Sequence, residues 1–182
     1  PVTPEQEALV GLAAEILLGR TSNEQLAAAE RSKDRWDKDL WRELAEAGLL
    51  GLAVPETHGG AGLGLTELCL LLEQQGRFLA PVPLWETTVA ALLLAEAGHG
   101  RLLPAVVAGD LRLSVSVDLG GGDGLVSGPF EALLLVDGEG VWLVEGFEAP
   151  GVETTNHTYG FDVRGGDRDR PGSAGPPSER PD

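Results

Sequence analysis

The residues best placed to do chemistry lie in one loop, where Pro55-Glu56-Thr57-His58 runs into four glycines between Gly59 and Gly64. A phosphate-binding loop would need a G-x-G-x-x-G pattern after a strand, or a lysine that reaches the phosphates. Here Leu65 stands in place of the last glycine, a helical segment precedes the loop, and the loop has no lysine. The glycines therefore predict a structural turn between two packed helices, because glycine allows the tightest backbone turns.

The other polar candidates stand alone in the sequence. His58, His99 and His157 are about forty or more residues apart, and each lies in a predicted loop. None has a partner at metal-ligand spacing, and none lies beside a Ser or Cys nucleophile. We interpret all three as surface polar residues, and Glu56 as a residue that orders its loop rather than a catalytic acid. The sequence thus supplies no metal-binding residue.

A second glycine run, Gly120–Gly124, is interpreted as a hairpin connection. An anion-binding nest is the alternative, which Asp118 and Asp123 disfavour because their charges repel phosphate. Trp36 and Trp41 are five residues apart and so do not share one helical stripe. We expect both to serve core or domain contacts rather than ligand stacking.

The cysteine count and the charge exclude further kinds of site. Cys69 is the only cysteine, which excludes an internal disulfide and a cysteine-based metal site. Since it lies on the apolar face of a predicted helix, we expect it to be a small core residue. The net charge of −16 argues against nucleic-acid binding, which needs clustered Lys and Arg. Residues 1–163 carry all of this excess, with 25 acidic and 9 basic residues.

Hydrophobic residues recur at helical spacing through the first hundred residues. Thr3-Pro4-Glu5 supplies a helix cap with proline in the first turn, ahead of Leu9 to Leu17. Further helices are predicted over 23–31, from about Asp37 to Gly48, and over 65–78, 86–97 and 102–108. The segment 86–97 is apolar nearly all round, which predicts burial between other elements.

The period changes after residue 110. Leu111 to Val117 alternates apolar and polar residues, which predicts a half-buried strand. Residues 131–136 and 141–145 flank a glycine-bearing loop and form a hairpin signal, and 152–155 is a candidate for one more strand. Helices followed by strands predict an α+β arrangement of separate domains. We expect a helical domain over 1–109, a β-domain over 110–163 and a disordered tail over 164–182, where Ala174 is the only apolar side chain.

The overall composition is that of a globular protein, with 42% hydrophobic residues. No stretch reaches the roughly 18 consecutive apolar residues of a membrane span. The first residues have neither the basic nor the apolar region of a secretory signal. We therefore expect a cytoplasmic protein without a membrane span.

Five short motifs follow one another in a fixed order. They are Pro55-Glu56, the Gly-Gly-x-Gly loop, Glu67 early in the next helix, Gly76-Arg77, and Ala80-Pro81-Val82-Pro83. In this order and spacing they resemble the N-terminal helical domain of the acyl-CoA dehydrogenases. The resemblance extends over residues 5–163 and is strongest over 36–110. The segment from Arg77 to Leu84 is similar to bacterial members, including those that act on steroid side chains.

The resemblance implies a flavoprotein that binds FAD and an acyl-CoA substrate and works as a homo- or hetero-oligomer. Family members abstract an α-proton from the thioester with a Glu while the β-hydride passes to FAD, which gives a trans-2-enoyl-CoA. They consist of a helical domain, a middle β-domain and a C-terminal helical bundle. The implied fold is α+β, with an N-terminal all-helical domain and a partial antiparallel β-barrel domain, to which the composition adds a disordered tail.

Two departures from the family pattern bear on activity. Val117-Asp118-Leu119-Gly120 occupies the place of the family's Leu-Thr-Glu-Pro motif, and Ser127-Gly128-Pro129-Phe130 that of its Trp-Ile-Thr segment beside the flavin. We therefore assign no cofactor-binding residue. The family's catalytic Glu lies in the C-terminal bundle, so no catalytic residue is assigned either, and loss of a positioned base costs about 10²–10⁴ in rate. The composition after Val163 suggests the frame-shifted or misannotated end of a longer gene.

Three functional interpretations follow. The preferred one is an acyl-CoA dehydrogenase-like flavoprotein oxidoreductase, truncated and inactive alone. The second is a non-catalytic partner subunit of a heteromeric acyl-CoA dehydrogenase, which the lost Thr-Glu-Pro motif favours. The third, independent of the family, is a helical protein-interaction module.

Overall fold

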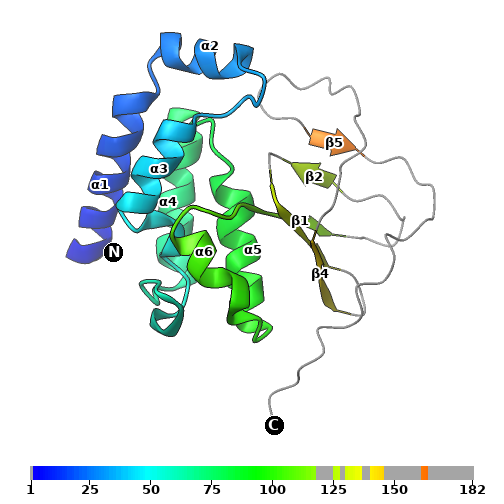
Figure 1. Ribbon diagram of the computed structural model, residues 1–182. Helices are drawn as coiled ribbons and strands as arrows, with labels where there is room; N and C mark the ends of the chain where they lie inside the picture. The colour runs from blue at the N-terminus through cyan, green and yellow to red at the C-terminus, as the bar shows by residue number, and fades with distance from the viewer. Residues whose placement is uncertain (1, 118–124, 128–129, 137–139, 146–160, 164–182) are drawn as a thin grey trace.

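The computed structural model describes residues 2–117, 125–127, 130–136, 140–145 and 161–163. Helices lie on one side of the molecule and strands on the other, with α5 between them (Figure 1). The helices are α1 (Pro4–Arg20), α2 (Asn23–Arg31), α3 (Lys38–Glu46), α4 (Leu65–Phe78), α5 (Leu84–Glu96) and α6 (Leu103–Val107), with short 3₁₀ turns η1 (Leu49–Gly51), η2 (Glu56–His58) and η3 (Gly100–Leu102). The strands are β1 (Leu113–Val117), β2 (Leu125–Ser127), β3 (Ala132–Val136), β4 (Val141–Glu145) and β5 (Phe161–Val163).

Several predictions concern residues outside this range. The tail at 164–182, the candidate strand at 152–155, the Gly120–Gly124 connection and His157 all lie outside the described residues.

Side-chain caps explain where the first helices begin. The Thr3 hydroxyl accepts from the Gln6 amide at 3.2 Å, and the Gln6 side chain accepts in return from the Thr3 amide at 3.0 Å. Ser22 and Gln25 repeat this reciprocal capping box at the start of α2. Such boxes satisfy backbone donors that a helix start leaves open. The predicted bounds of α2 and α4 are confirmed to the residue.

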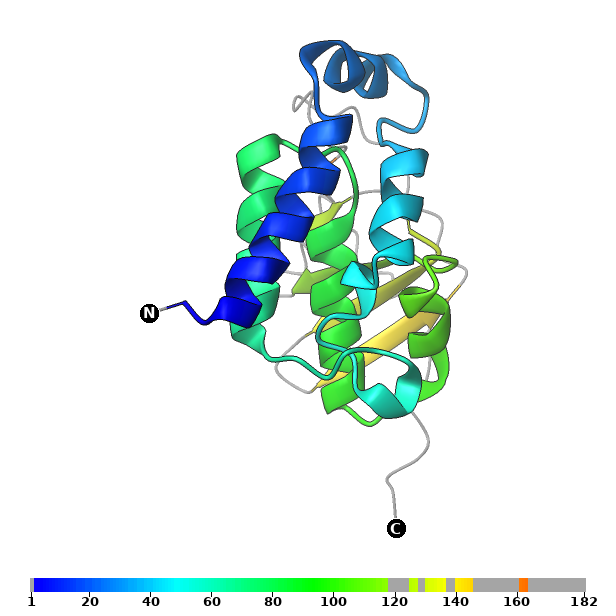
Figure 2. The same cartoon turned by 90° about the vertical axis from the view of Figure 1, so that its left-hand side faces the viewer.

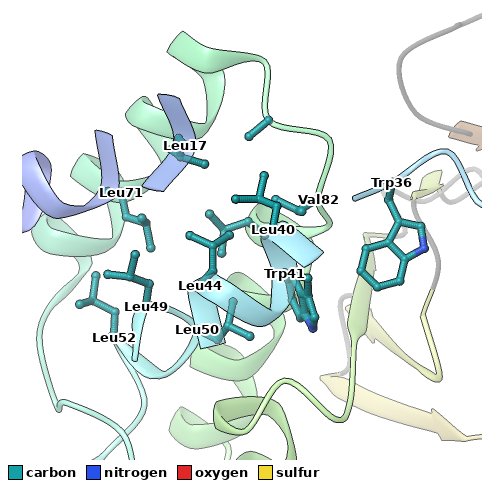
Figure 3. Packing of buried hydrophobic residues seen from close by; sticks show 13 residues of the cluster. Leu17, Trp36, Leu40, Trp41, Leu44, Leu49, Leu50, Leu52, Leu71 and Val82 are labelled. Carbon is teal, nitrogen blue, oxygen red and sulfur yellow. The ribbon is translucent and has the colours of Figure 1, made fainter. Parts of the chain in front are cut away.

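The helices enclose an apolar core that begins at the face where α1 packs against α4 and α3. Figure 2 shows α1 and α4 side by side, and Figure 3 shows the leucines that fill the space behind them. Leu17, Leu40, Leu44 and Leu71 are completely buried. The largest members of this cluster are Leu17, Trp36, Leu40, Trp41, Leu44, Leu49, Leu50, Leu52, Leu71 and Leu84.

The prediction that Cys69 belongs to the core is wrong. Its side chain is exposed on α4, whereas Leu68 and Leu71 are completely buried. The buried stripe of α4 continues through Gln75, so it follows the spacing 68, 71, 75. A neighbouring residue on a helix lies about 100° away from that stripe, which turns Cys69 to the outside.

The three-stranded sheet has the order β1-β3-β4. β3 and β4 are antiparallel, with Leu134 opposite Leu143, which confirms the predicted hairpin pairing. β1 runs parallel to β3, with Leu113 opposite Ala132. The α+β class is therefore confirmed, but the described strands do not form the expected antiparallel barrel. They form this mixed sheet, in which the chain crosses over between β1 and β3, and a separate antiparallel pair of β2 with β5.

Helix α5 lies between the helical core and the sheet, which confirms the burial predicted from its apolar sequence. Ala90, Ala91 and Leu94 pack in one cluster with Leu113 and Val115 of β1. The prediction of a half-buried β1 is wrong, because the serines of its other face, at 114 and 116, are at most 2% exposed. Both faces of β1 are covered, and β2 also contacts this strand.

Candidate functional site

The glycine loop, residues 59–64, folds back on the preceding segment, residues 51–56. All six of its amides donate to acceptors within the chain. An anion-binding nest would instead need successive amides that point outward, so the loop has no free donor for a phosphate. The acceptors are the carbonyl oxygens of Glu56 for Gly59, Pro55 for Gly60, Gly51 for Ala61, Val54 for Gly62 and Leu52 for Leu63, and the Glu67 carboxylate for Gly64.

Gly60 is the residue on which this loop depends most. A Cβ atom at this position would lie 2.1 Å from the Val54 carbonyl oxygen and 2.6 Å from the Gly51 carbonyl oxygen. These are backbone atoms, which cannot move aside as a flexible side chain can. Gly59 and Gly62 have φ angles of 86° and 64°, in the left-handed region that favours glycine. The geometry is that of the structural turn that the sequence predicts.

The histidines at 58 and 99 are both half-buried rather than simply at the surface. The His58 ring packs on Gly100, so closely that a Cβ there would lie 2.1 Å from its Cε1 atom. The fold thus brings His58 next to the residue that follows His99, which their spacing in the sequence could not indicate. In the described part of the chain, no group of three or more His, Cys, Asp or Glu side chains is arranged to hold a metal ion. The Glu56 side chain is exposed.

The start of α4 is tied to the start of α1 by two polar side chains. The Glu67 carboxylate accepts from the Gly64 amide at 3.1 Å and from the Gln6 side-chain amide at 2.8 Å. The same Gln6 side chain caps α1 through Thr3. The hydrogen bond from Gln6 is the main cause that lowers the pKa of Glu67 below its ordinary value. The Glu67 that forms part of the family motif is thus a helix-positioning residue here.

We expect the substitution Gln6→Ala to raise the pKa of Glu67 toward its ordinary value. Because the hydrogen bond favours the carboxylate, its contribution to stability is present above the ordinary pKa and is lost as the pH falls through the lowered pKa. An NMR titration of the Glu67 side chain measures this change. Gln25→Ala, which removes the capping box of α2, is the matched control and should leave Glu67 unchanged. If Glu67 titrates identically in the two variants, the hydrogen bond from Gln6 is not what lowers its pKa.

Residues 109–113 join α6 to β1, and we call them the junction. Side chains of two tryptophans and a threonine hold the junction in place. Trp41 Nε1 donates to the Gly109 carbonyl oxygen at 2.9 Å. The Thr87 hydroxyl donates to the Leu113 carbonyl oxygen at 3.0 Å and accepts from the Leu113 amide at 3.2 Å. Trp36 meets Trp41 edge-to-face, with ring centroids 6.2 Å apart. Both rings are buried, which confirms the core or domain contact predicted for them.

At least four of the nine basic side chains between residues 1 and 163 pair with carboxylates. A carboxylate partner partly offsets the positive charge that each of these cations would offer to a phosphate. The pairs are Arg20 with Glu43, Lys38 with Asp34, Arg42 with Asp39 and Arg112 with Glu131. These described ion pairs therefore give no support for a phosphate-binding cluster of basic residues.

None of the described helices combines the length and the apolar character that a bilayer crossing requires. The longest, α1, carries the acidic residues Glu5 and Glu7 in its first turn.

The helices α1 to α6, which we call the helical unit, define the class of the protein together with the start of the junction. Residues 3–110 match the family model of the acyl-CoA dehydrogenase N-terminal domain. This match covers α1 to α6 and ends inside the junction. The chain belongs to the acyl-CoA dehydrogenase family, as the motifs from Pro55 to Pro83 indicate.

Relatives with known sequences and structures agree with this assignment. Acyl-CoA dehydrogenase FadE27 of Mycobacterium tuberculosis is 36% identical over 129 residues, which are 68% of this chain and 35% of that protein. The structure of the Tcur3481-Tcur3483 steroid ACAD is 38% identical, with a TM-score of 0.72, over 90% of this chain and 55% of that one. The ChsE4-ChsE5 complex from Mycobacterium tuberculosis is 29% identical, with a TM-score of 0.66, over 80% of this chain and 48% of that one. The chain thus spans about a third of the curated relative and about half of these structures.

Proposed function

We propose that this chain serves an acyl-CoA dehydrogenase that desaturates an acyl-CoA thioester, and that its 182 residues are not active on their own. The match of residues 3–110 to the family's N-terminal domain is the observation that supports this proposal most directly. The family's flavin, FAD, would supply hydride acceptance when bound. The residues of this chain would supply the helical wall and the first strands beside it.

The two described side chains at the end of β1, those of Ser116 and Val117, do not fit a flavin. The family pattern places a hydroxyl and a polar turn there, whereas the described end of the strand offers Ser116, which is 2% exposed, and Val117, which is 47% exposed. A buried serine and an exposed aliphatic side chain provide no accessible donor for a polar cofactor ring. For this reason no step of the reaction is assigned to residues of this chain.

A second candidate is a non-catalytic partner subunit of a heteromeric acyl-CoA dehydrogenase. Two of the similar structures are named as pairs of chains, Tcur3481-Tcur3483 and ChsE4-ChsE5. A chain whose described residues at the end of β1 offer no exposed side-chain donor suits the subunit of such a pair that does not bind the cofactor at this place. In that case the acyl-CoA and the flavin would be bound chiefly by the other chain.

The visible spectrum of the purified chain distinguishes these proposals from an independent flavoenzyme. We expect a colourless protein that does not desaturate acyl-CoA substrates. The chain is then tagged in its native cells, and the chains that purify with it in equal amount are sequenced. A flavin-bearing acyl-CoA dehydrogenase chain would support the partner subunit. A yellow, active chain with no second subunit would disprove both proposals.

A further inference from the structure

Arg112 makes an unusually complete set of contacts at the edge of the sheet. Its backbone amide donates to the Glu131 carboxylate at 2.7 Å, and its carbonyl oxygen accepts from the Glu131 amide at 3.0 Å. Its guanidinium holds both carboxylate oxygens of the same residue, through Nε at 3.1 Å and through Nη2. Such bidentate pairs are among the strongest and most directional ion pairs in proteins. Arg112 and Glu131 thus join the residue before β1 to the residue before β3.

The other side of the same guanidinium faces the helical unit. Its central carbon lies 4.5 Å from the centroid of the Trp36 ring, within the range of a cation–π contact. The Arg112 side chain is 22% exposed. Burial lowers the pKa of this guanidinium, which the negative charge of Asp34 opposes, and an arginine remains protonated in a protein. One charged group is therefore shared between a tryptophan of the helical unit and a carboxylate of the sheet.

Trp36 reaches this position through a strained loop. It lies between α2 and α3, and Figure 3 shows it apart from the leucines, on the side of the strands. The residue before it, Arg35, has a φ of 54°, which non-glycine residues seldom adopt. The Arg35 amide donates to the Ser32 hydroxyl at 2.9 Å, which holds the turn. A strained backbone persists only where its surroundings fix it, and the contact with Arg112 is one such constraint.

We propose that Arg112 couples the sheet to the α2–α3 loop, and we call its contacts with Trp36 and Glu131 the latch. While both contacts are present, β1 and β3 stay paired. When they are lost, the two strands separate locally and the helices stay folded. The latch is independent of the proposed enzymatic role. It makes the junction a conformational hinge. The side-chain hydrogen bonds of Trp41 and Thr87 reach Gly109 and Leu113, on the β1 side, whereas Arg112 also bonds Glu131 at the start of β3 and so reinforces the backbone pairing of the two strands.

Amide hydrogen exchange of the whole chain tests this proposal. In Arg112→Met, which keeps the aliphatic stem but loses the charge, we expect amides of β1 and β3 to exchange about tenfold faster or more, as for the loss of a charged hydrogen bond. Amides of α1 and α4 should exchange at the rates of the parent chain. Arg42→Met is the matched control, since it removes the exposed Arg42–Asp39 pair, and it should leave both strands unchanged.

A second variant keeps the test decisive should Arg112→Met fail to fold. Glu131→Gln retains the backbone pairing and the Trp36 contact but loses the ion pair, so the same strands should exchange faster by a smaller factor. High salt should accelerate exchange in the parent chain and have little further effect in Glu131→Gln, because screening weakens only charged contacts. Unchanged exchange in β1 and β3, or an equal increase in strands and helices, would overturn the latch.

Discussion

Replacement of Gly60 by alanine should destabilise the fold by about 3 kcal/mol or more, at the upper end of what overpacking costs. The new methyl group would lie 2.1 Å from the Val54 carbonyl oxygen, and that oxygen already accepts from the Gly62 amide. Relief of the clash therefore breaks a hydrogen bond inside the loop as well as moving the backbone. Since folded proteins are stable by only about 5–15 kcal/mol, the loss is a large share of the total. Urea unfolding followed by circular dichroism measures it.

Substitutions at two other glycines are the controls. They measure the effects of backbone strain and of glycine flexibility without the steric clash. Gly59 has a φ of 86° but no atom near its Cβ position, so Gly59→Ala should cost only the strain of a left-handed backbone, about 1–2 kcal/mol. Gly76 lies within α4 with open space around it, so Gly76→Ala should stabilise by about 0.5–1 kcal/mol. If Gly60→Ala lowers the free energy of unfolding by no more than Gly59→Ala does, the close approach of the loop to Val54 does not limit which residue can occupy position 60.

The helices could be predicted from the sequence because their ends are decided locally. Thr3, Ser22 and Asp37 each accept from amides of their own first turn, and such contacts depend on neighbours within a few residues. The same is true of the β3–β4 hairpin, whose strands are joined by a short glycine-bearing loop. The exposure of Cys69 was mispredicted because a shift of one residue along a helix turns a side chain from the core to the surface. Apolar residues lie at several positions of α4, so the sequence does not show which of them face the core.

The remaining features depend on contacts between distant segments. The parallel pairing of β1 with β3 follows from a crossover, which local periodicity does not report. Ser114 and Ser116 are buried because other elements cover both faces of β1, so an alternating pattern was misleading. His58 meets Gly100, and Trp36 meets Arg112, across long stretches of chain. The family motif could be recognised without these contacts, but the junction that positions the sheet could not.

Trp41 connects the helical core to the junction, and we expect Trp41→Ala to be the most damaging side-chain truncation there. The ring is 4% exposed, and removal of a buried aromatic side chain costs about 3–5 kcal/mol. It also leaves the Gly109 carbonyl oxygen without its donor. The expected result is a large fall in the urea midpoint at an unchanged slope, which marks a change in stability rather than in the extent of unfolding.

The contribution of the hydrogen bond alone follows from Trp41→Phe, which keeps an aromatic ring in the core and loses only the Nε1 donor and part of the volume. An unpaired carbonyl costs about 1–3 kcal/mol when it is buried and less at the half-buried Gly109, so this variant should fall between the parent chain and Trp41→Ala. Trp85→Phe is the matched control, because Trp85 is 38% exposed on α5 and changes at such sites stay within about 0.5 kcal/mol. If Trp41→Phe is as stable as the control, the bond to Gly109 contributes nothing, and the junction is held by packing and by Thr87 instead.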